Sequence, residues 1–159
     1  MTSVYKDAVL SEDGVYRYEL YRRWADNTRP VLWVMLNPST ADAEIDDPTI
    51  RRVIGFSQSW GFQAAIVCNL FALRATNPQA LRTHSDPVGP DNDDYLMRAV
   101  CASDRIVVAW GAHPFASSRA AWVKKLLPNS HCLGVTKEGH PRHPLYARAD
   151  AQLVKWGTS

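Results

Sequence analysis

The sequence has 159 residues, of which 46% are hydrophobic and 21% are charged, a composition typical of a globular protein. This length favours one domain over residues 1–159. The net charge of +2 permits a nucleic-acid partner without requiring one. No apolar run reaches about 18 residues, so we expect no membrane-spanning segment. Three cysteines without paired spacing predict buried free thiols and a cytoplasmic protein.

The first predicted element is an antiparallel hairpin over about residues 4–24. Its turn is predicted at Ser11-Glu12-Asp13-Gly14, because polar residues and glycine interrupt the flanking apolar positions there. The segment from Val15 to Trp24 is rich in aromatic and alternating residues, as expected for a strand. We expect this hairpin to lie at the edge of the domain.

After Pro30, short apolar runs alternate with helical segments. The runs suit strands that are buried on both faces of a parallel sheet, and they are Val31–Leu36, Ala64–Leu70, Arg105–Trp110 and Cys132–Val135. Helices are predicted to begin at Asp47-Pro48 and Pro90-Asp91-Asn92, and to cover Phe115–Leu127 and Ala147–Trp156. The alternation predicts βαβ units and hence a three-layer α/β/α domain with a four-stranded parallel sheet.

Polar residues follow each predicted strand, at the edge where parallel sheets bind ligands. Asn37-Pro38-Ser39-Thr40 follows the first strand, and the second strand ends near Asn69. Gly111 follows the third strand, and a loop with His140 and His143 follows the fourth. Because the carboxyl ends of parallel strands share one edge, we expect these loops to converge there.

Each of these residues also has a simpler explanation. Asn-Pro is a common turn former, and loop histidines usually face solvent. The two histidines lack a clear third zinc ligand. The acidic residues Asp42, Glu44, Asp46 and Asp47 could bind magnesium, or could cap the next helix and face water. No dinucleotide-binding, P-loop or nucleophile-elbow motif is present, so we expect neither a cofactor nor a metal.

Four motifs in the chain resemble those of an uncharacterised bacterial and phage domain family, over about residues 10 to 157. They are MLNPSTADAEIDDPTIRR, NLFALRATNP, PVGPDND and GHPRHPLY. More distantly, the layout resembles the uracil-DNA glycosylase superfamily. That resemblance implies the strand order 2-1-3-4 for the four predicted strands, with motifs after the first, second and fourth.

The resemblance to the glycosylases implies roles for individual residues. MLNPS is similar to their GINPG-type motif, which implies that Asn37 positions the attacking water. IVCNLFALRATN is similar to their LLLN segment, which implies that Asn69 reads a base edge. HPRHPLY is similar to their HPSPL loop, which implicates His143, or His140 if the two loops are aligned in a shifted register. The serine and threonine after Pro38 and the acidic insertion depart from the pattern.

The chemistry of base excision fits these residue types. An amide can hold water at C1′, a histidine can donate to the base, and a second amide can read its edge. The predicted catalytic residues are therefore Asn37, His143 and Asp42, where Asp42, or Asp47 in its place, assists the weakly basic amide. The predicted substrate-binding residues are Pro38, Ser39, Thr40, Asn69, Phe71, Gly111 and His140. The predicted phosphate contacts are Arg51, Arg52, Arg74, Lys137 and Arg142. The first motif contains no lysine, which argues against a Schiff-base lyase step.

The sequence therefore predicts a monomeric, monofunctional glycosylase that acts on a modified or deaminated base flipped out of DNA. Two other functions remain open. One is a nucleic-acid or nucleotide-binding domain without catalysis. The other is a hydrolase of a small nucleoside or nucleotide, in which an arginine takes the phosphate and the acidic loop takes a sugar or Mg²⁺. A fourth possibility is a purely structural role without a binding or catalytic site.

Overall fold

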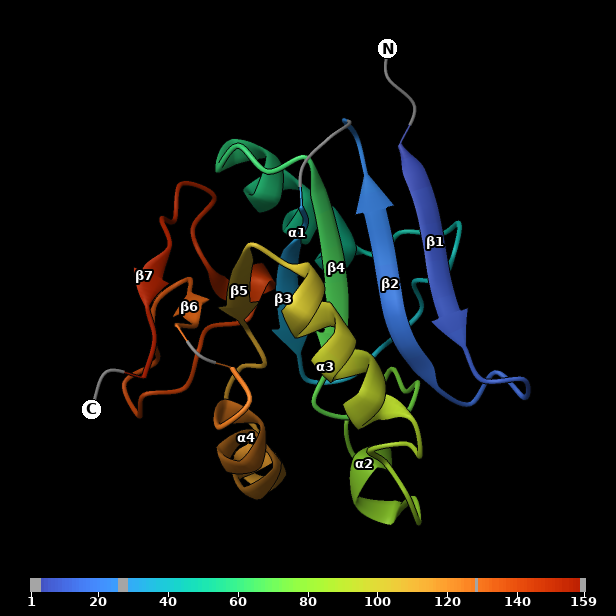
Figure 1. Ribbon diagram of the computed structural model, residues 1–159. Helices are drawn as coiled ribbons and strands as arrows, with labels where there is room; N and C mark the ends of the chain where they lie inside the picture. Colours follow the sequence, from blue (N-terminus) through green and yellow to red (C-terminus); the bar gives the residue numbers. More distant parts are fainter. Residues whose placement is uncertain (1–3, 26–28, 128, 158–159) are drawn as a thin grey trace.

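The structure is a computed structural model and describes residues 4–25, 29–127 and 129–157. Within these residues the strands form one seven-stranded mixed sheet in the order β1-β2-β4-β3-β5-β6-β7 (Figure 1). The strands are β1 (Tyr5–Leu10), β2 (Arg17–Arg23), β3 (Val31–Met35), β4 (Ala64–Asn69), β5 (Arg105–Val108), β6 (His131–Cys132) and β7 (Val154–Lys155). The helices are α1 (Pro48–Ser59), α2 (Ala80–Thr83), α3 (Asn92–Ala102) and α4 (Ser117–Lys124), with 3-10 turns η1 (Pro114–Ala116) and η2 (Pro144–Tyr146).

The prediction of a four-stranded parallel sheet in a three-layer domain is wrong, because the sheet is larger and mixed. The strands β4, β3, β5 and β6 are parallel neighbours. However, β1 pairs antiparallel with β2, β2 pairs antiparallel with β4, and β7 pairs antiparallel with β6. The hairpin therefore continues the sheet. The backbone groups along the outer side of β4 would otherwise be unpaired, and β2 supplies their partners.

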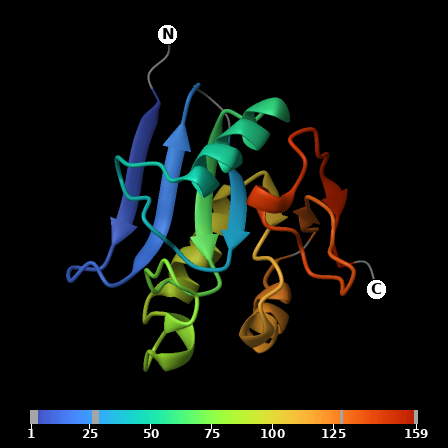
Figure 2. The same ribbon diagram turned by 180° about the vertical axis from the view of Figure 1, so that it is seen from behind.

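The direction of β2 decides what reaches the ligand edge. Figure 2 shows β2 running opposite to β3. Leu20 pairs with Val67 and Arg23 pairs with Ala64, so the first residue of β2 lies near the last residues of β4. Arg17 donates its backbone N–H to the carbonyl of Ala72 at 3.0 Å. An antiparallel strand thus presents its beginning at the edge where the parallel strands end.

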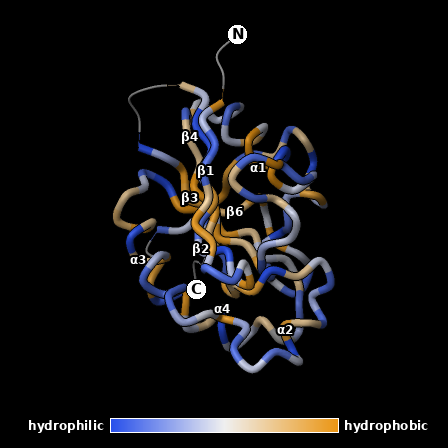
Figure 3. Tube along the Cα trace, turned by 90° about the vertical axis from the view of Figure 1, so that its right-hand side faces the viewer, coloured by the Kyte–Doolittle hydropathy of each residue, from blue (hydrophilic) through white to orange (hydrophobic). Residues whose placement is uncertain are grey.

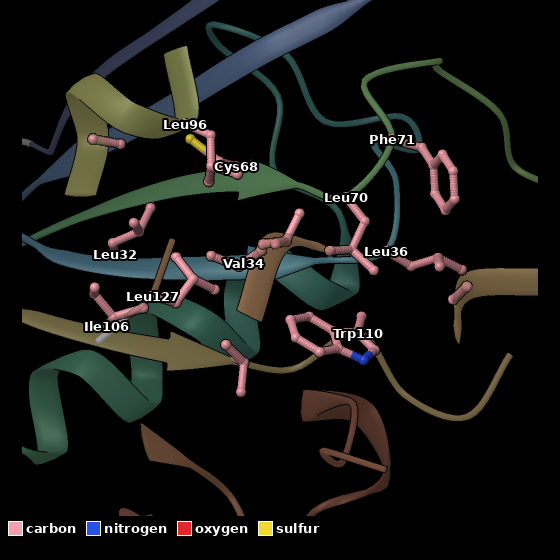
Figure 4. Close-up of a cluster of buried hydrophobic side chains, with 14 of the residues drawn as sticks. Leu32, Val34, Leu36, Cys68, Leu70, Phe71, Leu96, Ile106, Trp110 and Leu127 are labelled. Atoms are coloured by element: carbon pink, nitrogen blue, oxygen red, sulfur yellow. The ribbon is translucent and has the colours of Figure 1, made fainter. Parts of the chain in front are cut away.

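The sheet is buried on both faces, which explains the continuous apolar runs. Alternate residues of β3 belong to two hydrophobic clusters: Leu32 and Val34 to one, Trp33 and Met35 to the other. Figure 4 shows the first cluster, which includes Leu96 of α3. The second cluster packs against α1, and Figure 3 shows the hydrophobic residues concentrated along the central strands. Burial of each large apolar side chain contributes about 1.5–3 kcal/mol.

The start of α1 follows from local sequence, as predicted. Asp47 is the N-cap, and its Oδ1 accepts a hydrogen bond from the backbone N–H of Ile50 at 2.9 Å. Pro48 takes the first helical position. The helix buries Ile50, Val53 and Phe56 against the sheet. This packing fixes the N-terminus of α1 beside the ends of β3 and β4.

The predicted helix over Ala147–Trp156 is wrong, because this segment contains β7 and otherwise irregular backbone. The N–H of Trp156 donates to the carbonyl of Ser130 at 2.9 Å, and its ring packs edge-on against Trp110 at 5.2 Å. Hydrogen bonds between β7 and β6 thus take the place of the intrahelical hydrogen bonds that were expected in this segment. The fourth predicted strand is shorter than expected, since Gly134 has φ of 105° and ends β6 early. The third predicted helix begins as η1 and continues as α4.

Over the described ranges, none of the helices has the length and apolar character needed to cross a membrane.

Candidate functional site

A cavity of about 650 Å³ lies beyond the carboxyl ends of β3 and β4. Its wall is built by the beginnings of β2 and α1, by the loops after β3, β4 and β5, and by the segment that leads into η2. Small-molecule sites of about 300–1,000 Å³ are typical, so the cavity has room for a nucleobase and part of a sugar.

Six of the predicted site residues line this cavity: Asn37, Ser39, Asn69, Gly111, Arg142 and His143. Nine others are not among its lining residues, and they are Pro38, Thr40, Asp42, Arg51, Arg52, Phe71, Arg74, Lys137 and His140. The convergence of the loops after β3 and β4 with the segment before η2 therefore brings together the two asparagines and one of the two histidines.

Asn69 has the most unusual environment of the lining residues. It ends β4, is 1% exposed, and both its side-chain atoms Oδ1 and Nδ2 are buried without a hydrogen-bond partner. A buried polar atom without a partner costs about 1–3 kcal/mol. A ligand edge with the complementary acceptor and donor would supply the missing partners, and Asn69 is among the residues that line the cavity.

Two side chains hold the end of β4 in place. Asn92 of α3 is fully buried, and its Nδ2 donates to the carbonyl oxygens of Asn69 at 3.0 Å and Leu70 at 3.2 Å. Arg119 of α4 donates through Nε to the same carbonyl of Leu70 at 2.8 Å. These bonds fix the backbone from which the Asn69 side chain enters the cavity.

The side-chain nitrogen of Asn37 donates hydrogen bonds, whereas its side-chain oxygen accepts none from the described residues. Its Nδ2 donates to the carbonyl oxygens of Pro38 at 3.0 Å, Leu73 at 3.4 Å and Ala75 at 2.9 Å. No donor from the described residues reaches its Oδ1. The amide therefore ties the loop after β3 to the loop after β4, and its oxygen remains able to accept a hydrogen bond from water.

The hydrogen bonds of His143 fix its tautomer. Its Nδ1 accepts from the backbone N–H of Leu145 at 3.2 Å and so caps η2. In the neutral ring the proton is therefore on Nε2, which makes Nε2 a donor. Burial lowers the pKa of His143; the nearby Asp47 carboxylate opposes this shift, and His113 adds to it. At neutral pH the side chain is an uncharged hydrogen-bond donor.

The stability of the protein is expected to fall as the pH drops below the ordinary histidine pKa of about 6.5. Because the folded-state pKa of His143 is lowered, the unfolded chain binds the proton more readily in that range. His143→Asn keeps an acceptor for the Leu145 N–H, and its free energy of unfolding should decline less. Urea unfolding between pH 7.5 and 5 measures both slopes. His131, whose pKa burial also lowers, is present in both proteins, so equal slopes would contradict the expectation.

The acidic residues of the first motif have separate structural roles. Asp42 closes its own loop: its Oδ1 accepts from the backbone N–H groups of Glu44 at 2.9 Å and Ile45 at 2.8 Å, and these bonds lower its pKa. Asp46 pairs with the buried Arg22 at 2.8 Å. Asp47 caps α1 and also lines the cavity. The carboxylate that reaches the cavity is therefore Asp47 rather than the predicted Asp42.

Several of the predicted phosphate contacts bind the protein's own backbone. Arg52 donates through Nε to the carbonyl of Pro144 at 3.1 Å and through Nη2 to that of Ala147, so it holds η2 against α1. Arg51 donates to the carbonyl of Asp46 at 3.2 Å, and Arg74 donates to that of Gly14 at 3.3 Å. Their contact with phosphate remains a prediction.

Arg17 is one of the lining residues that the sequence did not indicate. It begins β2, is 2% exposed, and donates through Nη1 to the carbonyl of Ala41 at 3.0 Å. Its Nε is buried without a partner. An arginine in a strand of a hairpin that was expected at the edge gave no signal, because its position depends on the pairing of β2 with β4.

The mouth of the cavity carries exposed apolar side chains. Tyr146 is 80% exposed and Leu145 is 43% exposed, and both belong to η2. The exposed Arg142 lies in the segment just before them. An exposed aromatic residue beside a cation is common at surfaces that contact nucleic acid, because bases stack and phosphates pair there.

Among the described residues, no group of three or more His, Cys, Asp or Glu side chains is placed to hold a metal ion.

The described residues thus form a domain with a seven-stranded mixed sheet and four helices, and a cavity lies at the ends of its parallel strands. The family model described as "Protein of unknown function (DUF1643)" matches residues 17–145, and the chain belongs to this family. The matched range includes the strands β2 to β6 and most of the cavity wall. Searches of curated proteins and of solved structures found no match.

Proposed function

We propose that the protein hydrolyses the N-glycosidic bond of a modified or deaminated base that is flipped out of DNA. The observation that carries the proposal is Asn69, a cavity-lining residue whose buried Oδ1 and Nδ2 have no hydrogen-bond partner among the described residues. Such a pair matches the edge of a nucleobase, on which a carbonyl and an N–H are neighbours. Enzymes that act on single bases read the extruded base by hydrogen bonds of this kind.

The remaining lining residues supply the other groups that the reaction needs. Asn37 Oδ1 can hold the water, and His143 Nε2 can donate to a carbonyl of the base. The water oxygen adds to C1′, the C1′–N bond breaks, and its electron pair leaves with the base. Asp47 replaces Asp42 as the carboxylate that takes the proton of the water and faces the positive charge developing on the sugar.

The exposed residues of η2 support DNA as the substrate. A base that leaves the duplex leaves a gap, and minor-groove and base-flipping proteins fill such gaps with apolar side chains. Tyr146 and Leu145 lie at the cavity mouth with exposed side chains that suit this role. Arg142 beside them can neutralise a phosphate.

The direct test measures abasic sites on oligonucleotides that carry uracil, a mismatched thymine, hypoxanthine or a hypermodified phage-type base. Wild type should produce abasic sites on at least one, and His143→Asn should slow the reaction by about 10²- to 10⁴-fold. His140→Asn is the matched control in the same loop and should retain activity, since His140 does not line the cavity. Equal activity of the two variants, or neither cleavage nor binding by wild type, would contradict the proposal.

The same assay separates DNA from a small nucleoside as substrate. Tyr146→Ala should weaken binding to the oligonucleotide by about tenfold for one lost stacking contact, and should weaken binding of the free base less, since Tyr146 lies exposed at the mouth of the cavity. Release of base from free nucleosides alone would favour the nucleoside hydrolase. Salt-dependent binding without abasic product would favour a non-catalytic domain, a function consistent with the inability of the Asn37 amide to take a proton.

A further inference from the structure

Arg17 carries a buried charge that the fold does not neutralise. Of its guanidinium nitrogens, Nη1 donates to a backbone carbonyl and Nε has no partner. None of the ion pairs between described residues includes Arg17. The side chain is 2% exposed and lines the cavity. Burial of an uncompensated charge is costly, so a fold retains one only where something else compensates it.

The buried charge of Arg22, on the same strand, is compensated by an ion pair and by hydrogen bonds. Arg22 is also buried, and its Nε pairs with Asp46 Oδ1 at 2.8 Å. Its Nη1 and Nη2 donate to the carbonyl oxygens of Asp7, Tyr21, Asp42 and Ile45. The two arginines differ in that Arg22 faces the closed acidic loop whereas Arg17 faces the cavity.

Arg17 keeps its charge at neutral pH. Burial lowers the pKa of its guanidinium to about 10, and the carboxylate of Asp47 acts in the opposite direction. A pKa near 10 is well above 7. The inner wall of the cavity therefore presents a cation together with the open amide of Asn69.

We propose that Arg17 binds the negative charge of the base, so that the cavity selects a nucleobase held as an anionic ring. The inference rests on the proposed function and names the charge state of its ligand. As the C1′–N bond breaks, its electron pair moves onto the ring, and the charge spreads to the ring oxygens. A guanidinium already desolvated and in place stabilises that charge without reorganisation of water. Asn69 then forms hydrogen bonds with the edge of the base, and Arg17 selects the anionic form of the base.

The test compares two free bases of nearly the same size. Uracil is a neutral ring at pH 7, whereas barbiturate is a planar pyrimidine anion with one further oxygen. Calorimetric titration of the intact protein should show barbiturate binding about 10- to 100-fold more tightly than uracil, as expected for hydrogen bonds to a charged partner. Arg17→Met should abolish this preference, and Arg17→Lys should retain part of it.

A matched control removes the same charge elsewhere. Arg98 lies exposed on α3, and α3 packs against the face of the sheet opposite to α1. Arg98→Met should leave the preference intact, which separates the local effect of Arg17 from that of net charge. Circular dichroism confirms that each variant is folded before titration.

The possible results separate this inference from the proposed function. Uracil and barbiturate binding equally well, or a preference that survives in Arg17→Met, overturns the role of Arg17 and leaves base binding in place. Failure of both bases to bind overturns the proposed function itself. Inorganic phosphate that binds through Arg17 while neither base binds assigns the cation to a phosphate group and overturns the inference.

Discussion

Replacing Arg22 by methionine is expected to lower the free energy of unfolding by about 3 kcal/mol, whereas Arg17→Met leaves it unchanged or raises it. Loss of the Arg22 guanidinium leaves the Asp46 carboxylate and several carbonyl groups without their main donor. Lys6 remains 3.2 Å from Asp46, which places the loss at the lower end of the range for broken buried pairs.

The opposite result for Arg17 follows from its missing partners. Arg17→Met loses one hydrogen bond to a carbonyl, worth about 1 kcal/mol. It also removes a buried cation that forms no ion pair with a described carboxylate, and apolar replacements of buried charges are often neutral or stabilising. Urea unfolding at pH 7 compares the two variants on the same strand. A loss for Arg17→Met as large as that for Arg22→Met would show that the fold itself compensates Arg17.

The second large effect concerns two buried asparagines, Asn69 at the end of β4 and Asn92 at the start of α3. Asn69→Leu is expected to weaken the binding of the base by about 100-fold, because it removes the donor and the acceptor that read the edge. The folded state should be as stable as wild type or more stable, since two unpaired buried polar atoms are replaced by an apolar group of similar size. Titration with the free base and urea unfolding measure the two effects.

Asn92→Leu is the matched variant and should behave in the opposite way. It is expected to lower the free energy of unfolding by about 2 kcal/mol, because Nδ2 of Asn92 bonds two backbone carbonyls in the core. Leu70 keeps the bond from Arg119, which limits the loss. If Asn69→Leu destabilised the protein as much as Asn92→Leu, the Asn69 amide would be part of the core rather than of a binding site.

These pairs of variants separate residues that stabilise the fold from residues that serve the cavity. Arg22 and Nδ2 of Asn92 donate to groups inside the protein, whereas Oδ1 of Asn92 is buried without a partner among the described residues. Nε of Arg17 and both side-chain polar atoms of Asn69 are buried without a partner among the described residues, and both residues line the cavity. Natural sites commonly retain such unfavourable groups because function requires them, so substitutions that stabilise the protein should be the ones that remove binding.

The central strands show which features of the sheet can be predicted from local sequence patterns. Apolar runs marked where β3, β4 and β5 lie, because strands covered on both faces need apolar residues at every position. The same patterns contain no information on whether a neighbouring strand pairs with the edge of β4. The seven-stranded mixed sheet therefore emerges from hydrogen bonds between residues far apart in the chain.

What the sequence determined by itself is local. A buried run that stops at Asn37-Pro38, a strand that ends at Asn69, and a helix that starts at Asp47-Pro48 all follow from neighbouring residues. Their meeting at one cavity was predictable, because the ends of parallel strands share an edge.

Only the tertiary structure decided which charges reach that cavity. Asp42 was expected there, but the N–H groups of its own loop hold its carboxylate. Asp47 and Arg17 are there instead, the first through the packing of α1 on the sheet and the second through the antiparallel pairing of β2 with β4. Both contacts join segments distant in sequence. The sequence left Asp42 and Asp47 as alternatives, and it gave no pattern from which the position of Arg17 could be predicted.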